Sequence, residues 1–375
     1  MATPFFPIPV FALHILLLLT APLLQITYAL PSSRLPHRSL AHPPKDCPPF
    51  SGTFNIDYFQ LYPENADWDT NSCTVWFGAL WNATVAIYDP YTSTMVSLLS
   101  FPGTSYTGLD HIGGVAWDSS TGLITILSDP AKQWATAGAD LSGDHLIMKY
   151  NPNTETLLWT LNITELTHGK YGGFQDVETD RRGNTYIVGT WPGTVLRVDK
   201  HGRAVRNWYL PDPMPPTTQK GFSGLAAVPG TEILLSNDGD GHLYRFDMRD
   251  DVGKPVHVPI IPPVFYNGTD AVYLPPRYGG KVLLVAVNRV GVQVLRSGDK
   301  TWQTAEYLGT IPTPKGSLYD GGVVTAAVQI GYPGSIYMII DYTDFPWVLG
   351  TVAGNRTTFP MPDITDQIEQ LLKSG

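Results

Sequence analysis

The sequence predicts an all-β protein with the architecture of a six-bladed β-propeller, and three observations lead to this prediction. Gly and Pro are frequent, with 36 and 33 copies in 375 residues, and aromatic residues reach 11%. This mixture is typical of short strands joined by turns. A pattern of strands and turns recurs with a period of roughly fifty residues. Long amphipathic helical patterns are nearly absent.

Each copy of the repeat begins with a Gly-rich turn and continues through β-branched runs that polar turns separate. The clearest copies span residues 113–130, 172–202, 221–247, 268–295 and 321–350, and a degenerate first copy spans 54–90. Equivalent first-strand positions hold Val115, Val177, Leu225 and Val272. Their separations of 62, 48 and 47 residues fit four-stranded antiparallel blades that stack around one axis. The alternative is a seven-bladed ring in which the 62-residue interval contains a weak blade.

The two ends of the chain differ from this repeat. Residues 10–26 form an apolar run before Thr27-Tyr28-Ala29, so we interpret residues 1–29 as a secretory signal peptide, with a membrane anchor as the alternative. Residues 30–46 read as a flexible leader, and residues 47–375 as a single propeller domain. A short helix is expected at 364–372, capped by Asp363. The mature protein is expected to be secreted, without a stable membrane span.

Secretion gives meaning to the cysteines and to the glycosylation sequons. Cys47 and Cys73 are the two cysteines of the chain, and an oxidising compartment permits a disulfide between them, with two separate buried thiols as the alternative. The bridge would close a loop of about 26 residues and stabilise the fold by about 3 kcal/mol. Asn-x-Thr sequons, each a candidate glycosylation site, occur at Asn82, Asn162, Asn267 and Asn355.

Several functional classes are disfavoured by composition and motifs. The net charge is -9 and no basic run occurs, which argues against a nucleic-acid partner. The sequence contains no H-E-x-x-H, Walker A or G-x-S-x-G motif, so zinc-protease, nucleotide-binding and serine-hydrolase sites are not expected. We expect neither a metal nor another cofactor.

By analogy with other propellers, the loop that enters each innermost strand and the loop between the second and third strands open on the same face. The side chains that we expect around this funnel are Trp81, His111, Asp176, Trp191, Asn237, Asn288, Arg289, Asp341 and Tyr342. Other polar residues at such positions are Asp110, Ser128, Asp129, Gln175, Thr190, Ser223, Asp238, Thr269, Asp270 and Asp320. Aromatic walls with a few amides, acids and one His suit a polar organic ligand.

Structural roles are the alternative for the same residues. An Asp beside Gly often serves only to stabilise a turn. His111 could form a structural hydrogen bond between blades, and Trp191 could pack between blades. Arg289 follows the apolar run 282–287, where a buried charge would need a partner or a ligand.

A metal site is the main chemical alternative. Gluconolactonase-like propellers hold a divalent cation with Glu, Asn and Asp from separate blades, and this chain offers Asn237, Asn288 and Asp341. Its first blade lacks a clear Glu, because Glu64 lies in a Tyr-Pro-Glu-Asn segment that reads as a turn.

Three stretches carry a resemblance to a known group of proteins. They are FNIDYFQLYPENADWD (54–69), WFGALWNATVAIYDP (76–90) and GGFQDVETDRRGNTYIVGTWPGTVLRVDK (172–200). They resemble fungal natural-product-cluster propellers, a group that includes the trichothecene-cluster propeller protein and the secreted hetero-Diels–Alderases of tropolone-sesquiterpenoid pathways. The resemblance covers about residues 50 to 360, and the signal peptide and sequons favour the secreted Diels–Alderase branch.

The resemblance implies a cofactor-free enzyme with small-molecule polyketide and terpene substrates. A hydroxymethyl tropolone or polyketide would lose water to give an o-quinone methide, which would add to a humulene-type terpene and form a dihydropyran ring. From propeller geometry, and not from the family, we assign proton handling to His111 or Asp176, and oxygen binding to Arg289 with Asn237 and Asn288. Trp81, Trp191 and Tyr342 would form the walls. The alternatives are a metal-dependent lactonase-like hydrolase and a non-catalytic binding propeller.

Overall fold

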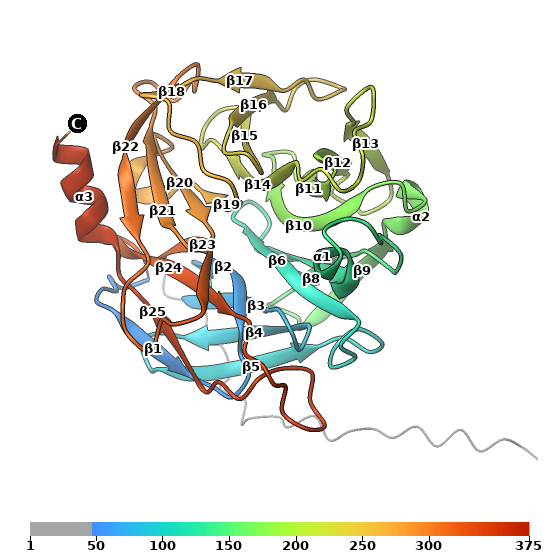
Figure 1. The fold of residues 1–375 in the computed structure, drawn as a ribbon, viewed down its shortest axis with the longest axis vertical. Helices are drawn as coiled ribbons and strands as arrows, with labels where there is room; N and C mark the ends of the chain where they lie inside the picture. The colour runs from blue at the N-terminus through green and yellow to red at the C-terminus, as the bar shows by residue number, and fades with distance from the viewer. Residues whose placement is uncertain (1–46, 375) are drawn as a thin grey trace, which may run out of the picture. The chain divides into compact units, whose positions relative to one another are not determined.

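The computed structural model describes residues 47–374, in which five sheets follow one another along the chain (Figure 1). The first sheet comprises β2 (Pro63–Asp69), β3 (Thr74–Ala79), β4 (Thr84–Asp89) and β5 (Thr94–Ser100), and the second β6 (Asp110–Asp118), β7 (Leu123–Pro130), β8 (Leu146–Asn151) and β9 (Thr156–Asn162). The third comprises β10 (Gly172–Thr179), β11 (Thr185–Trp191), β12 (Thr194–Val198) and β13 (Val205–Tyr209), and the fourth β14 (Phe222–Ala227), β15 (Ile233–Asp238), β16 (Leu243–Asp247) and β17 (Val256–Val258). The fifth comprises β19 (Thr269–Tyr273), β20 (Val282–Val287), β21 (Gly291–Arg296), β22 (Ala305–Pro312) and β18 (Ile260–Ile261), which pairs in parallel with β22.

The first strand of each of these blades lies innermost, next to a central axis (Figure 1). A further long strand, β23 (Gly322–Gly331), fills the space between β19 and β2 and contacts both of them. The ring of contacts therefore runs β2–β6–β10–β14–β19–β23 and returns to β2. This arrangement confirms a β-propeller.

The predicted number of blades is wrong: the structure has five, and neither six nor seven. Where a sixth four-stranded sheet was expected, the chain forms two separate ladders, β23 with β24 (Gly334–Tyr342) and β1 (Phe54–Asp57) with β25 (Thr358–Met361). An isolated bridge between Tyr337 and Asp363 joins the two ladders. The sheet is interrupted because residues 343–357 leave β24 as a long loop before β25 begins.

The 62-residue interval between Val115 and Val177 does not contain a hidden blade. The connection between β7 and β8 includes helix α1 (Ala131–Ala135), and helix α2 (Thr164–Thr167) follows β9. These insertions lengthen the second blade and its link to the third, which removes the reason for a seven-bladed ring.

Each blade is packed between its neighbours, so its inner strands are apolar on both faces. Every residue of β3, β20 and β24 is buried, whereas Leu157 and Leu158 of the outer strand β9 are 45% and 47% exposed. Apolar clusters join neighbouring blades; Trp76 of the first blade, for example, packs with Ile112 and Tyr150 of the second.

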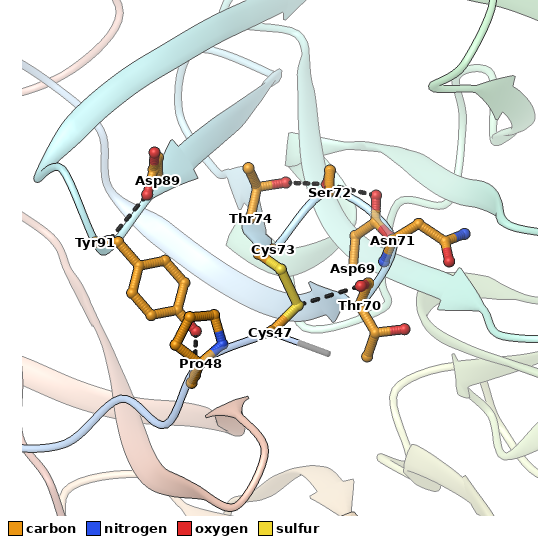
Figure 2. Close-up of a disulfide and its surroundings, with 10 residues drawn as sticks. All are labelled: Cys47, Pro48, Asp69, Thr70, Asn71, Ser72, Cys73, Thr74, Asp89 and Tyr91. Atoms are coloured by element: carbon orange, nitrogen blue, oxygen red, sulfur yellow. Dashed lines mark hydrogen bonds between the residues drawn. A yellow bond between two sulfur atoms is a disulfide. The ribbon is translucent and has the colours of Figure 1, made fainter. Parts of the chain in front are cut away.

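The Cys47–Cys73 disulfide is present, as predicted (Figure 2). It attaches the segment that precedes β1 to the turn between β2 and β3. Nearby, the Tyr91 hydroxyl donates a hydrogen bond to the Pro48 carbonyl. The first described residues are therefore fixed to the first blade at two points.

The C-terminal helix is also confirmed, as α3 (Thr365–Ser374), with the Asp363 carboxylate accepting from the Thr365 amide at 3.0 Å. A short 3-10 helix, η1 (Pro276–Tyr278), follows β19. None of the helices within residues 47–374 has the length and apolar character needed to cross a lipid bilayer. The predicted signal peptide at 1–29 and leader at 30–46 lie outside the described residues.

Candidate active site

All six strands that border the axis carry a β-bulge near their first residues. The residues at these register breaks are Glu64, Gly113, Gln175, Ser223, Asp270 with Ala271, and Thr325. A bulged residue lacks a ladder partner and its side chain is redirected. The polar members therefore gather at the end of the axis where the innermost strands begin. We name Glu64, Gln175, Ser223, Asp270 and Thr325 the axial cluster.

Hydrogen bonds link the axial cluster from blade to blade. Gln175 Nε2 donates to the Ser223 carbonyl at 2.9 Å, and Ser223 Oγ donates to the Thr269 carbonyl at 3.0 Å. Asn288 Nδ2 lies 3.0 Å from Asp270 Oδ2, and Asn237 Nδ2 donates to the Asp270 carbonyl at 2.8 Å. The structure thus brings the predicted Asn237 and Asn288 together around Asp270.

The cluster is rich in carboxyl groups that lie close to one another. Burial raises the pKa of Glu64 well above its usual range, and the charges of Asp270 and Asp341 raise it further, whereas Lys220 opposes the shift. Lys220 Nζ donates to the Thr269 carbonyl at 2.9 Å, beside Asp270. Burial and the excess of acids over cations therefore favour the protonated form of Glu64.

Glu64 requires a correction. The sequence suggested that it lies in a turn away from the funnel, but it is the second residue of β2 and interacts electrostatically with Asp270 and Asp341. The first blade therefore does place a Glu at the axis, contrary to the prediction. Within residues 47–374, however, no group of three or more His, Cys, Asp or Glu side chains is arranged to hold a metal ion.

An aromatic rim lies on the same face of the ring. The Trp81 and His111 rings meet edge-on with centroids 5.0 Å apart, Trp347 lies 6.0 Å from Trp81, and Phe345 stacks on Trp347 at 5.8 Å. We name Trp81, His111, Phe345 and Trp347 the aromatic rim. Phe345 and Trp347 are 68% and 41% exposed, so this rim offers apolar surface to a ligand.

His111 is in contact with the rim but cannot serve as an acid at neutral pH. It is buried, and burial lowers its pKa to about 4. The imidazole is therefore neutral in ordinary buffers and is suited to accept a proton or a hydrogen bond.

Asp176 lies deeper in the ring than the sequence suggested. Its carboxylate accepts hydrogen bonds from the Val177 and Leu225 amides, each at 2.9 Å, and so joins the third blade to the fourth. Burial raises its pKa to about 7, although these two amide bonds oppose the shift. Asp176 therefore has a structural role in joining two blades, which could not be predicted from the sequence.

Three other predicted residues differ from expectation in their exposure. Tyr342 is fully buried beneath the Arg356 guanidinium, which lies 3.6 Å from its ring centroid, so it does not line an open wall. Arg289 is exposed in the turn between β20 and β21, with φ of 59°, and is not the buried charge that was expected. Trp191 is buried and packs against Trp134, with centroids 6.0 Å apart.

Asp341 is 4% exposed, and its Oδ1 atom has no hydrogen-bond partner in the described part of the chain. Burial raises its pKa well above the usual range, and the Tyr342 amide opposes this. The Asn237 Oδ1 and Thr325 Oγ1 atoms are likewise buried without partners. Unpaired buried oxygens are uncommon, and they mark places where a ligand or water can bind.

Two cavities flank this arrangement. One, of about 560 Å³, adjoins the aromatic rim at Phe345 and is also lined by Asp344 and Arg356, which form a bidentate ion pair at 2.8 and 3.1 Å. The other, of about 260 Å³, lies where the innermost strands end and is lined by Asp67 and Glu178 among others. The second cavity could not be predicted from the sequence, because its lining comes from segments far apart along the chain.

Four residues of this face were not predicted as candidate functional residues from the sequence: Glu64, Thr325, Phe345 and Trp347. A usable signal existed for the last two, since two aromatic residues follow Asp341-Tyr342 within one loop. No signal existed for Thr325, because its role depends on the bulge.

Comparisons with known proteins agree with this fold. No family model matches the chain. The chain is 34% identical to "Trichothecene biosynthesis protein 14" of Trichoderma arundinaceum, over 87% of this chain and 92% of that protein. It is 30% identical to "Core trichothecene cluster (CTC) protein 14" of Fusarium sporotrichioides, over 87% and 88% of the two chains.

Solved structures share the architecture at low sequence identity. The major allergen Mala s 1 of Malassezia sympodialis has a TM-score of 0.70 at 20% identity, over 84% of this chain and 96% of the allergen. A gluconolactonase from Xanthomonas campestris has a TM-score of 0.50 at 15% identity, over 86% and 97% of the two chains. These similarities support the fold alone. From the two fungal relatives, this chain belongs to the family of trichothecene cluster protein 14.

Proposed function

We propose that this protein is a cofactor-free enzyme of fungal secondary metabolism. It dehydrates a hydroxymethyl tropolone or polyketide and directs the hetero-Diels–Alder addition of the resulting o-quinone methide to a humulene-type terpene. The observation that carries the proposal is the pairing of an aromatic rim with the hydrogen-bonding axial cluster on one face of the ring. Membership in a family named for biosynthesis proteins supports it.

The chemistry needs few groups from the protein. A proton converts the departing hydroxyl to water, the C–O bond breaks, and the ring hydroxyl of the substrate loses its proton. The quinone methide then forms one C–C and one C–O bond with an alkene, which closes the dihydropyran. The net change is the loss of one water, without oxidation or reduction, so proton transfer and orientation suffice.

Residues of the described face are assigned as follows. Asn237 and Asn288, fixed at Asp270, present amide groups to the polar ring of the substrate. The rim residues Trp81 and Trp347 cover the terpene and exclude water, which would otherwise consume the quinone methide. Neutral His111 accepts a hydrogen bond from the substrate hydroxyl. Arg289, on the exposed turn, approaches oxygen atoms that project from the site.

The proposal is tested by incubating the purified protein with a hydroxymethyl tropolone and humulene, and by following product by chiral chromatography. We expect one stereoisomer to form faster than in buffer. Trp347→Ala should lower turnover about tenfold or more by losing orientation of the apolar partner. Tyr332→Ala removes an aromatic side chain that is 66% exposed at the opposite end of β23 and serves as the control. Racemic product at the buffer rate would contradict the proposal and favour a binding propeller.

A metal-dependent lactonase-like hydrolase is the second candidate. It is favoured by the placement of Glu64 near Asp270 and Asp341, beside Asn288. Elemental analysis of protein purified without chelators decides between the two. Stoichiometric calcium, manganese or zinc, together with lactone hydrolysis that EDTA abolishes, would support the hydrolase.

A further inference from the structure

We propose that Glu64 is the proton donor of this site and that Asp270 positions and tunes it. The inference deepens the proposed function and rests on it. It does not follow from the sequence, which pointed to His111 or Asp176.

Glu64 differs from the other polar residues of the axial cluster in its contacts. Glu64 is the bulged residue of β2, at the same level of the ring as Gln175, Ser223 and Asp270. Unlike the side chains of those three residues, the Glu64 side chain makes no hydrogen bond within residues 47–374, and the residue is not fully buried. A carboxyl group that is free of structural bonds and open to the axis can give its proton to a ligand.

Other acids along the axis are engaged in binding the protein itself, except Asp341, whose Oδ1 is unpaired but which is only 4% exposed. Asp270 is held by Asn288, and Asp176 accepts two backbone amides. Asp67 accepts the Trp68 and Trp117 amides, each at 2.7 Å. Protonating any of these groups during turnover would disturb contacts between blades, which Glu64 does not make.

Charged groups from three other segments surround Glu64. The groups that face Glu64 are Asp270 from β19, Asp341 from β24 and Lys220 from the loop before β14. Burial and the two acids favour the protonated form of Glu64, and Lys220 opposes them. Once the proton has left, Lys220 stabilises the carboxylate until a proton returns.

Two unpaired buried oxygens offer binding positions for the hydroxyl groups of the substrate. Thr325 Oγ1 lies at the bulge of β23, and Asn237 Oδ1 lies beside the Asp270 backbone; both atoms are buried without partners in the described chain. They are complementary to the hydroxyl groups of a hydroxymethyl tropolone. This binding would place the leaving hydroxyl near the Glu64 carboxyl.

The proposed step balances without a co-reactant. The Glu64 O–H bond breaks and its proton bonds to the leaving hydroxyl. The C–O bond breaks with both electrons passing to oxygen, so water departs. The ring hydroxyl of the substrate then loses a proton, which restores the Glu64 carboxylic acid.

The test compares wild type with Glu64→Gln on two substrates, the hydroxymethyl tropolone and its chemically generated o-quinone methide, each with humulene. We expect Glu64→Gln to slow conversion of the alcohol about 100-fold or more and to keep the stereochemistry obtained from the preformed quinone methide. The exposed Glu165→Gln serves as the matched control.

A second variant covers the case in which Glu64→Gln fails to fold, which a thermal melt would reveal. Asp270→Asn keeps Glu64 but removes one negative neighbour, so the alkaline limb of the wild-type rate profile should move to lower pH. An unmoved limb, or alcohol conversion by folded Glu64→Gln within about threefold of wild type, overturns the role of Glu64 alone. A wild-type protein that is inactive on both substrates overturns the proposed function as well.

Discussion

Asn82 illustrates how burial changes the meaning of a short motif. The Asn82 side chain is 8% exposed and its Nδ2 donates to the Gln60 carbonyl, whereas Asn267 and Asn355 are exposed. Asn162 is half-buried, with its Nδ2 bonded to Asp144. A glycan on Asn82 would require this packed corner of the first blade to open.

We therefore predict different occupancies of these sequons when the full chain is expressed in a fungal host. Glycopeptide mass spectrometry should find glycans on Asn267 and Asn355 and an unmodified Asn82. A fully occupied Asn82 would show that this corner is open when the glycan is transferred. Replacing Asn355 by Gln should reduce the mass by one glycan and serves to assign the peaks.

At the level of single residues, the sequence indicates which side chains carry polar or aromatic groups at the site, but it does not indicate how buried each of them is. Asn237 and Asn288 were expected on the same face because each lies at the end of the second strand of its blade, Asn237 within β15 and Asn288 directly after β20. The burial of Tyr342 and the exposure of Arg289 could not be predicted. The first depends on Arg356 from a distant loop, and the second on a left-handed turn conformation.

At the level of elements, the disulfide is the feature with the most direct consequence. Cys47 and Cys73 are separated by 26 residues and both are buried. We predict that Cys47→Ser with Cys73→Ser lowers the free energy of unfolding by about 3 kcal/mol, because the unlinked unfolded chain gains conformational freedom. Denaturant melts measure this.

Reduction of the disulfide provides a control in the same denaturant melts. Dithiothreitol should lower the midpoint of wild type and leave the double variant unchanged. Equal midpoints for the two proteins without reductant would mean that the contacts of Pro48 and Tyr91 hold the segment without help from the disulfide.

The period of the repeat predicted most elements correctly for a physical reason. Each of the apolar residues Val115, Val177 and Leu225 follows a bulge by two residues, and Val272 directly follows a two-residue bulge, so the apolar spacing records a real structural repeat. The last part of the ring escaped prediction because β1 and β25 come from opposite ends of the sequence. No local pattern connects two such segments, and the bulges themselves leave no mark in hydropathy.

At the level of the whole molecule, the axis concentrates buried acids. Burial raises the pKa of Asp67 to about 6 and that of Asp176 to about 7, and it raises that of Glu178 well above its usual range. The folded state therefore binds protons more tightly than the unfolded chain. Stability falls as pH rises between about 4 and 7, because the folded form loses that advantage.

Two buried histidines act in the opposite sense. Burial lowers the pKa of His111 and His145 to about 4, so their contribution is lost as pH falls below about 6.5. The raised acids outnumber them. We predict that the melting temperature is higher at pH 6 than at pH 8, by roughly 5 °C, as differential scanning calorimetry would measure.

The variant Asp176→Asn provides a check on this explanation, since it removes one of the titrating groups. Its melting temperature should change less between the two pH values than that of wild type. A wild-type protein that is more stable at pH 8 would show that the axial acids are ionised in the fold.

The pairing of β1 with β25 has a consequence for co-translational folding. Phe54 lies opposite Met361 and Asp57 opposite Thr358, so β1 leaves the ribosome well before β25, with 301 residues separating Asp57 from Thr358. Until then, the backbone groups of β1 that face β25 have no partner. During translation, β1 therefore remains unpaired until β25 has been synthesised. A chain truncated before residue 358 cannot form the β1–β25 ladder and cannot close the ring in this way.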